Sequence, residues 1–185
     1  MARRILLLGP PGAGKGTQAA LIANALHVPH ISTGEMLRAA VAAGTDLGKQ
    51  VESIMAAGEL VSDRLVVAIV DERLLEEDAR CGYLLDGFPR TLGQAEALND
   101  SVVDAIGTVV VLDVDTEEVV RRLLKRAEEE GRADDNEETI RRRLEVYEAD
   151  TAPLVAFYGA AVVAVDGTGT VDEVLSRIMI TLAKL

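Results

Sequence analysis

A glycine-rich stretch that follows a short aliphatic run constrains the fold of this chain more than any other feature. Residues 9–17 read GPPGAGKGT, and residues 5–8 before them read ILLL. Such a loop between a strand and a helix turns backbone N–H groups toward an anion, and the positive end of the helix adds to the attraction. Lys15 adds a cation that can follow a transferring phosphoryl group. The alternative is a glycine-rich turn with an incidental lysine, and the full motif spacing between strand and helix disfavours it.

One position in this loop departs from the common phosphate-binding motif. The motif reads G-x-x-x-x-G-K-[ST], and the hydroxyl after the lysine ligates magnesium. Here that position is Gly16, and the hydroxyl comes one residue later, at Thr17. A chain that keeps the loop without this ligand must hold its metal ion by other groups.

Length and composition restrict the architecture and the partners. At 185 residues the chain is most simply one domain. The formal net charge of −12 argues against non-specific binding of nucleic acid, which depends on an excess of Lys and Arg. Cys81 is the only cysteine, which excludes a disulfide framework or a cysteine zinc site within the chain. The sequence shows no signal peptide and no apolar run near the roughly 20 residues of a membrane span, so we expect a cytoplasmic protein without membrane partners.

Short runs rich in Val, Ile and Leu alternate with longer segments of helical period along the chain. This alternation is typical of parallel strands joined by crossover helices. Strands are expected at residues 3–8, 29–31, 83–85, 108–113 and 161–165. Their continuous apolar character indicates burial on both faces of the sheet. The predicted fold class is therefore α/β, a doubly wound parallel five-stranded sheet flanked by helices.

Two insertions into this single domain are expected. Residues 32–61 form a small helical excursion, in which four glycines act as breakers: Gly34, Gly44, Gly48 and Gly58. The second insertion is the charged stretch 125–135. The core then consists of residues 1–31, 62–124 and 136–185.

The stretch YLLDGFPR, residues 83–90, ends a predicted strand at the edge where doubly wound sheets bind ligands. Asp86 is therefore the expected carboxylate to orient a metal ion or its water molecules. The alternative is a strand-end aspartate that closes a turn before Gly87. Arg90 follows a proline that stiffens its loop, and its guanidinium can bind a phosphate through two hydrogen bonds, although a plain surface arginine is the alternative.

Basic residues are concentrated near the second insertion. Eight of the 19 Lys and Arg residues lie there: Arg121, Arg122, Lys125, Arg126, Arg132, Arg141, Arg142 and Arg143. An anion-binding function is one explanation in so acidic a chain. The interleaved Asp and Glu residues also fit a solvated helical face whose charges pair with one another. Position alone does not decide which arginines point inward.

Five segments together resemble the adenylate kinase family. They are GPPGAGKGT (9–17), STGEMLR (32–38), DGFPR (86–90) with Gln94, GRADDNEET (131–139) and RRRLEVY (141–147). They occur in the family's order and spacing over nearly the whole chain, and they resemble the form with a short lid over ATP. The resemblance implies a P-loop NTPase-type core with two small mobile insertions, a nucleoside-monophosphate-binding lobe at 32–61 and a lid at 125–135.

The resemblance also implies an activity and a set of site residues. The activity is reversible, Mg²⁺-dependent transfer of the terminal phosphoryl group of ATP to AMP, giving two ADP, by a monomer without zinc. The implied ATP-binding residues are Gly12, Ala13, Gly14, Lys15, Gly16, Thr17, Arg126 and Gly169. The implied AMP-binding residues are Thr33, Arg38, Glu59, Leu60, Val61, Gly87, Phe88, Pro89, Arg90, Gln94, Arg132 and Arg143. The implied catalytic cations are Lys15, Arg90, Arg126, Arg132 and Arg143.

This reaction offers an explanation for Gly16. An acceptor phosphate, whose second pKa is about 6, is largely ionised at neutral pH and needs no general base. In-line positioning and positive charge around the transferred group are then sufficient. We expect magnesium to be held mainly by nucleotide oxygens and water, with Asp86 orienting the water shell, so that Gly16 replaces the hydroxyl ligand. Thr17 then offers its backbone N–H and hydroxyl to the ATP phosphates.

Two other functions remain open from the sequence. A UMP/CMP-type nucleoside monophosphate kinase would share the motifs, although Thr33 and Gln94 favour adenine. A P-loop nucleotide switch or regulatory ATPase would need no second nucleotide site. Binding of AMP alone therefore separates the kinases from the switch.

Overall fold

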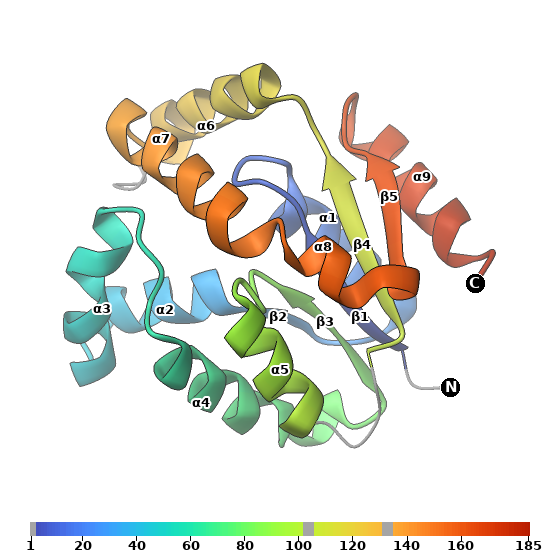
Figure 1. Ribbon diagram of the computed structural model, residues 1–185, viewed down its shortest axis with the longest axis horizontal. Coiled ribbons are helices and arrows are strands. Elements are labelled where there is room, and N and C mark those ends of the chain that lie inside the picture. Colours follow the sequence, from blue (N-terminus) through green and yellow to red (C-terminus); the bar gives the residue numbers. More distant parts are fainter. Residues whose placement is uncertain (1–2, 102–105, 131–134) are drawn as a thin grey trace.

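Five parallel strands form one sheet between two layers of helices (Figure 1). The computed structural model describes residues 3–101, 106–130 and 135–185. The strands are β1 (Arg3–Leu8), β2 (His30–Ser32), β3 (Gly82–Asp86), β4 (Thr108–Asp113) and β5 (Val162–Asp166), in the order β2-β3-β1-β4-β5. The predicted α/β fold with a five-stranded parallel sheet is confirmed.

Three strands differ from the sequence prediction by one residue at each end. Strand β2 begins at His30 because Pro29 has no N–H for the ladder, although its carbonyl accepts a hydrogen bond from Leu84 N at 2.9 Å. Strand β5 begins after Ala161, which ends a short 3₁₀ turn. Strand β3 is longer than expected at both ends and includes Asp86.

The core lies on both faces of the sheet, as the apolar strands predict. In β1, Ile5 and Leu7 point to one face while Leu6 and Leu8 point to the other, and all four are at most 4% exposed. The first face is covered by α1 (Lys15–Leu26), α6 (Thr116–Glu130) and α9 (Val171–Leu182). The second is covered by α4 (Asp63–Leu74), α5 (Leu92–Ser101) and α8 (Leu154–Tyr158).

The first predicted insertion contains two helices, α2 (Thr33–Ala42) and α3 (Asp46–Ala56). Gly44 and Gly58 follow these helices with φ of +63° and +75°, as expected of breakers. The same prediction is wrong for Gly34 and Gly48, which lie inside α2 and α3. A Cβ at Gly48 would lie 2.1 Å from Ala40 O, so this glycine allows α3 to approach the backbone of α2 closely.

The second predicted insertion begins as a continuation of α6. Residues 125–130 form the last turns of this helix, and the segment 131–134 lies outside the described residues. Helix α7 (Glu137–Val146) follows, and a π-helical turn (Tyr147–Thr151) then leads back to the core. The boundaries proposed for the two insertions remain predictions. In the described ranges, no helix combines the length and the apolar character needed to cross a bilayer.

Candidate active site

The loop after β1 has the conformation of an anion cradle. Gly9, Gly12 and Gly14 have φ of +145°, +86° and +90°, which disfavour any residue with a Cβ. A Cβ at Gly12 would also lie 2.8 Å from Leu123 Cγ and 2.9 Å from Val119 O, so the loop packs directly against α6. No side chain of the described residues caps the N-terminus of α1. The N–H groups of its first turn are therefore available to an anion.

Lys15 begins α1, and its side chain turns back over the loop. Lys15 Nζ donates to Gly9 O at 2.7 Å and to Pro10 O at 2.8 Å. These bonds hold the ammonium group against the loop.

The pKa of Lys15 is lowered to about 8. Burial is the largest cause, and Asp86 opposes it by favouring the charged amine. Three nearby cations lower the pKa further: Arg90, Arg143 and Arg126. A strongly shifted pKa in a cleft where cations converge is typical of a functional site.

Asp86 ends β3 beside the phosphate-binding loop and is 7% exposed. His30 Nε2 lies 3.5 Å from Asp86 Oδ2. Burial by itself raises the pKa of this carboxyl, but His30 and the charges of Lys15 and Arg90 lower it more, so the pKa lies below its ordinary value. Asp86 is thus an ionised carboxylate at the sheet edge, and His30 is a neighbour that the sequence did not single out.

This edge has a donor set that fits magnesium. A Cβ at Gly16 would lie 3.6 Å from Asp86 Oδ2, so the missing hydroxyl and the carboxylate occupy neighbouring positions. Across the described residues, no group of three or more His, Cys, Asp or Glu side chains is placed to hold a metal ion. Magnesium usually keeps several water molecules and binds to one or two carboxylates and substrate phosphates.

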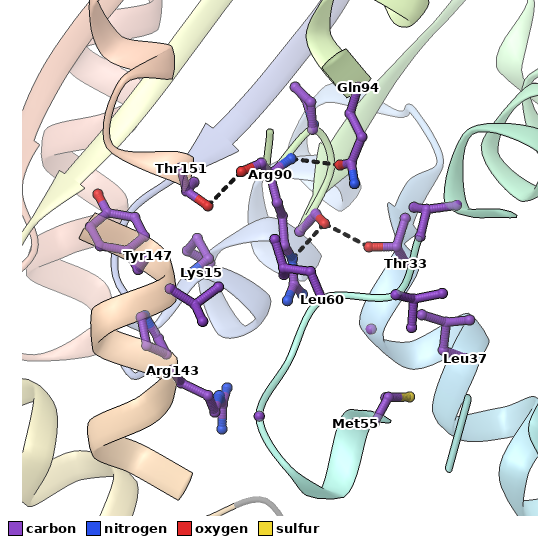
Figure 2. Close-up of a pocket in the computed structure, with 18 of the residues that line it drawn as sticks. Lys15, Thr33, Leu37, Met55, Leu60, Arg90, Gln94, Arg143, Tyr147 and Thr151 are labelled. Atoms are coloured by element: carbon purple, nitrogen blue, oxygen red, sulfur yellow. Dashed lines mark hydrogen bonds between the residues drawn. The ribbon is translucent and has the colours of Figure 1, made fainter. Parts of the chain in front are cut away.

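A pocket opens from the phosphate-binding loop toward the α2–α3 insertion (Figure 2). Its walls contain most of the residues that the resemblance implies for the second nucleotide. These are Thr33, Arg38, Glu59, Leu60, Val61, Gly87, Pro89, Arg90, Gln94 and Arg143, and Lys15 lies at the loop side. Apolar side chains of Leu37, Met55 and Val66 complete the wall. Phe88 is 1% exposed and packs in the core behind the pocket.

Hydrogen bonds fix the polar wall of this pocket (Figure 2). Gly87 O accepts from Thr33 Oγ1 at 2.7 Å and from Arg90 Nε at 2.8 Å. Gln94 Oε1 accepts from Arg90 N at 2.7 Å, and Gln94 Nε2 donates to Asp63 Oδ1 at 2.8 Å. The second N–H of this carboxamide has no partner in the described part of the chain. Asp63, which sequence reasoning missed, therefore sets the orientation of Gln94.

A buried carboxylate brings two arginines of the basic stretch together. Asp135 Oδ2 lies 2.6 Å from Arg126 Nε, and Asp135 Oδ1 lies 2.7 Å from both Arg126 NH2 and Arg143 NH1. The side chain of Asp135 is fully buried, whereas the two arginines are about one-fifth exposed. Sequence reasoning missed this role of Asp135. Arg132, which was predicted to join the same cluster, lies outside the described residues.

The basic stretch divides into inward and outward residues, and its outward part fits a helical face whose charges pair with one another. Three exposed cations pair with acidic neighbours on their own helices: Arg121 with Glu118, Lys125 with Glu129, and Arg141 with Glu137. Arg122, Arg126 and Arg143 are instead at most 26% exposed. The division depends on the side of the helix on which each residue lies, and the sequence spacing did not determine that side.

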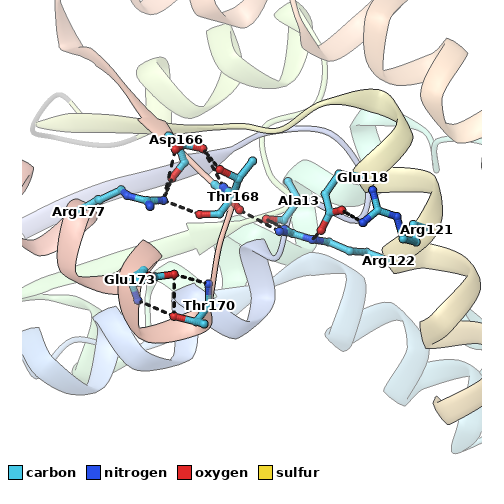
Figure 3. Close-up of polar contacts among 10 residues, drawn as sticks. Ala13, Glu118, Arg121, Arg122, Asp166, Thr168, Thr170, Glu173 and Arg177 are labelled. Carbon is cyan, nitrogen blue, oxygen red and sulfur yellow. Dashed lines mark hydrogen bonds and ion pairs between the residues drawn. The ribbon is translucent and has the colours of Figure 1, made fainter.

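Arg122 joins the phosphate-binding loop to the loop after β5 (Figure 3). Arg122 NH2 donates to Gly167 O at 3.1 Å, and NH1 lies 3.4 Å from Ala13 O. Gly169, in the same loop, has a φ of +102°, and a Cβ there would lie 2.6 Å from Glu173 Oε2. Arg122 thus attaches the loop that carries Gly169 to the phosphate-binding loop. The sequence alone did not reveal this link between the two loops.

Comparison with known proteins agrees with this geometry. The model of the family described as adenylate kinase matches residues 7–163. The chain is 50% identical over 184 residues to an adenylate kinase of Thermobifida fusca (strain YX), with 97% of each chain covered. It is also 50% identical over 182 residues to an adenylate kinase of Stenotrophomonas maltophilia (strain K279a), covering 95% of this chain and 97% of the relative. The resemblance inferred from the five segments is confirmed, and the chain belongs to the adenylate kinase family.

Proposed function

We propose that the chain transfers the terminal phosphoryl group of ATP to AMP, reversibly, and so forms two ADP. One observation carries the proposal. The anion cradle with Lys15 opens into the pocket beside the α2–α3 insertion. This pocket has its own arginines, and hydrogen bonds fix its polar wall. A switch or a simple ATPase needs the cradle alone, whereas a kinase for nucleotides needs both sites.

We assign the second pocket to AMP. Arg38, Arg90 and Arg143 line it and supply charge for the phosphate. The remaining N–H of Gln94 is a donor for a ring nitrogen of adenine, and Thr33 lies in the same wall. The segment 59–61 contributes further wall contacts, and Gly87 O supports Arg90 by accepting a hydrogen bond from its Nε.

The donor nucleotide is assigned to the other side of Lys15. The backbone N–H groups of residues 12–17 are proposed to bind the ATP phosphates, and the hydroxyl of Thr17 to assist them. Arg126 is proposed to contact ATP from the lid, and Gly169 to contact adenine through a backbone group. The bridge from Arg122 to Ala13 and Gly167 supports this arrangement because it joins the phosphate-binding and base-binding loops.

The proposed reaction needs charge and alignment rather than a base. An oxygen of the AMP phosphate attacks the terminal phosphorus of ATP, and the bond from that phosphorus to the bridging oxygen of ADP breaks. Lys15 and the cations Arg90, Arg126, Arg132 and Arg143 are proposed to stabilise the charge that spreads over the transferred group. Magnesium, when bound with ATP, neutralises part of the phosphate charge, and Asp86 is proposed to orient its water molecules.

The test of this proposal compares acceptors in a coupled assay. AMP is expected to be the best acceptor with ATP as donor, and UMP and CMP are expected to be poor. Calorimetry with AMP alone is expected to show one binding site. Higher kcat/KM with UMP or CMP would favour the pyrimidine kinase, and absence of AMP binding would favour the nucleotide switch.

The proposal includes a monomer that acts in the cytoplasm. The exposed free thiol of Cys81 supports a reducing compartment. Sedimentation of the protein with and without nucleotides tests the monomer.

An ion pair between the α2–α3 insertion and α7 leads to a further prediction. Arg142 Nε lies 2.6 Å from Glu59 Oε1, and Arg142 NH2 lies 3.2 Å from Glu59 Oε2. This hydrogen bonding lowers the pKa of Glu59. Because Glu59 belongs to the proposed AMP wall, Arg142→Met is expected to raise the KM for AMP and to leave kcat unchanged. The rise should be only about twofold to threefold, because an ion pair exposed to solvent contributes little free energy.

Steady-state kinetics with AMP varied at saturating ATP measure this effect. Arg141→Met is the matched control because Arg141 is the preceding residue and pairs with Glu137 on the exposed side of α7. The same KM for AMP in both variants would contradict the prediction.

A further inference from the structure

The loop between β5 and α9 is hydrogen-bonded almost completely, except at one residue. Residues 167–170 have four N–H and four C=O groups. Asp113 O, Asp166 Oδ1 and Glu173 Oε2 accept from the N–H groups of Gly167, Thr168 and Thr170. Arg122, Arg177 and the backbone N–H of Val174 donate to the carbonyls of the same three residues. Within the described part of the chain, both groups left without a partner belong to Gly169.

Arg177 holds this loop from the side of α9 (Figure 3). Its side chain points toward the N-terminus of α9, as helical side chains do, and so reaches the preceding loop. Arg177 NH1 donates to Thr168 O at 2.5 Å and to Asp166 O at 3.0 Å, and it lies 3.4 Å from Asp166 Oδ2. One guanidinium nitrogen therefore joins two carbonyls and a carboxylate that flank Gly167.

Asp166 closes the same turn from the other direction. Asp166 Oδ1 accepts from Thr168 N at 2.9 Å and from Thr168 Oγ1 at 2.6 Å. The bonds from Thr168, followed by the charge of Arg177, lower the pKa of Asp166. Asp166, Thr168 and Arg177 thus form one connected network, and its effect is to fix the direction of the chain as it enters Gly169.

We infer that Arg177 is a positioning residue for the donor base: it holds the loop so that the free backbone groups of Gly169 face adenine. This inference rests on the proposed contact between Gly169 and the base. The carbonyl of Gly169 can accept a hydrogen bond from the 6-amino group of adenine only if its direction is fixed. Arg177 makes no contact with the base in this scheme and acts through Thr168 and Asp166.

The experiment compares ATP with the triphosphate of purine riboside, which lacks the 6-amino group. For the wild type, ATP is expected to have the higher kcat/KM as donor at saturating AMP. In Arg177→Met, the KM for ATP is expected to rise roughly fivefold to tenfold, and the preference for ATP is expected to fall by the same factor. The kcat with ATP and the KM for AMP are expected to stay within about twofold of the wild type.

Three further variants make the comparison specific. Arg177→Lys, which keeps the charge and a donor, is expected to recover part of the preference. Thr168→Val, which removes the hydroxyl bond to Asp166, is expected to lose part of it, and it serves as the test if Arg177→Met does not fold. Arg73→Met is the matched control, since Arg73 also binds an aspartate, Asp78, through two hydrogen bonds of 2.8 Å and is 20% exposed. The control is expected to keep the wild-type preference.

Three results would overturn the inference in distinguishable ways. A wild type that prefers ATP, together with an Arg177→Met variant that prefers it equally, would remove the role of Arg177 and leave the Gly169 assignment standing. A wild type that does not distinguish the two donors would remove the Gly169 assignment, and the inference with it. A parallel loss of ATP binding, AMP binding and kcat in Arg177→Met would show a general structural role and would also overturn the inference.

Discussion

Replacement of Lys15 by methionine is expected to lower kcat roughly a thousandfold, the loss typical for a group that stabilises the charge of a transferred phosphoryl group. AMP binding should change little, because Arg38, Arg90 and Arg143 line that pocket independently. Stopped-flow or coupled kinetics give kcat, and calorimetry gives the Kd for AMP. Near-normal turnover in Lys15→Met would remove the proposed role of the lysine.

The same variant is expected to be more stable than the wild type when no nucleotide is bound. The pKa of Lys15 is lowered to about 8. The charged amine is therefore less stable in the folded protein than in the unfolded chain. After allowance for the solvent that reaches this half-buried side chain, we expect Lys15→Met to gain about 1 to 2 kcal/mol at pH 7. Urea unfolding of both proteins measures the difference.

The pH dependence of this gain has a definite sign. Between the folded pKa of about 8 and the ordinary value of 10.5, the unfolded chain binds more protons at Lys15 than the folded protein does. The stability of the wild type therefore rises with pH in this window, and that of Lys15→Met does not. The advantage of the variant should be complete below the folded pKa and decline above it. Lys49→Met, at an exposed lysine, is the control.

Replacement of Asp135 by asparagine is expected to destabilise the nucleotide-free protein by about 3 kcal/mol, because a buried carboxylate that bonds two arginines loses its charge. Nucleotide phosphates would supply the missing negative charge to Arg126 and Arg143. The deficit in the free energy of unfolding should therefore shrink when ATP and AMP are saturating. Turnover should also fall, roughly tenfold, because the two arginines lose the group that aligns them.

Thermal or urea unfolding with and without the two nucleotides measures the deficit. Asp150→Asn is the control, because Asp150 is exposed in the turn after α7. An equal deficit for Asp135→Asn in both conditions would show that the carboxylate and the nucleotides do not share the same arginines.

The sheet and the loops at its edge were predictable because they depend on local patterns. The strand before Gly9 and the strand that ends in Asp86 are short apolar runs followed by glycine, and a parallel sheet places their carboxyl ends together. The candidate residues of the pocket followed from motifs that the chain shares with its family. Their shared pocket was therefore expected once the family was recognised.

The supporting contacts were not predictable, because each depends on the phase of a helix or on a distant partner. Arg121 and Arg122 are adjacent in sequence, yet the first is exposed and the second reaches Gly167. Asp63 supports Gln94 from 31 residues away. Gly48 was misread as a breaker because sequence does not reveal how closely α3 approaches Ala40. Such tertiary contacts override local propensity.

Helix α6 explains where this chain can tolerate changes in length. Four of its residues hold neighbouring elements: Val119 and Leu123 pack on Gly12, Arg122 reaches Ala13 and Gly167, and Arg126 reaches Asp135. Because successive residues of an α-helix are rotated by about 100° around its axis, one inserted residue before Arg126 would turn that arginine away from its partner. A change in length between Arg126 and Asp135, within the predicted lid at 125–135, would leave the contacts of Val119, Arg122 and Leu123 in place. The spacing from Val119 to Arg126 is expected to stay fixed among descendants of this chain, while the length of the predicted lid can diverge.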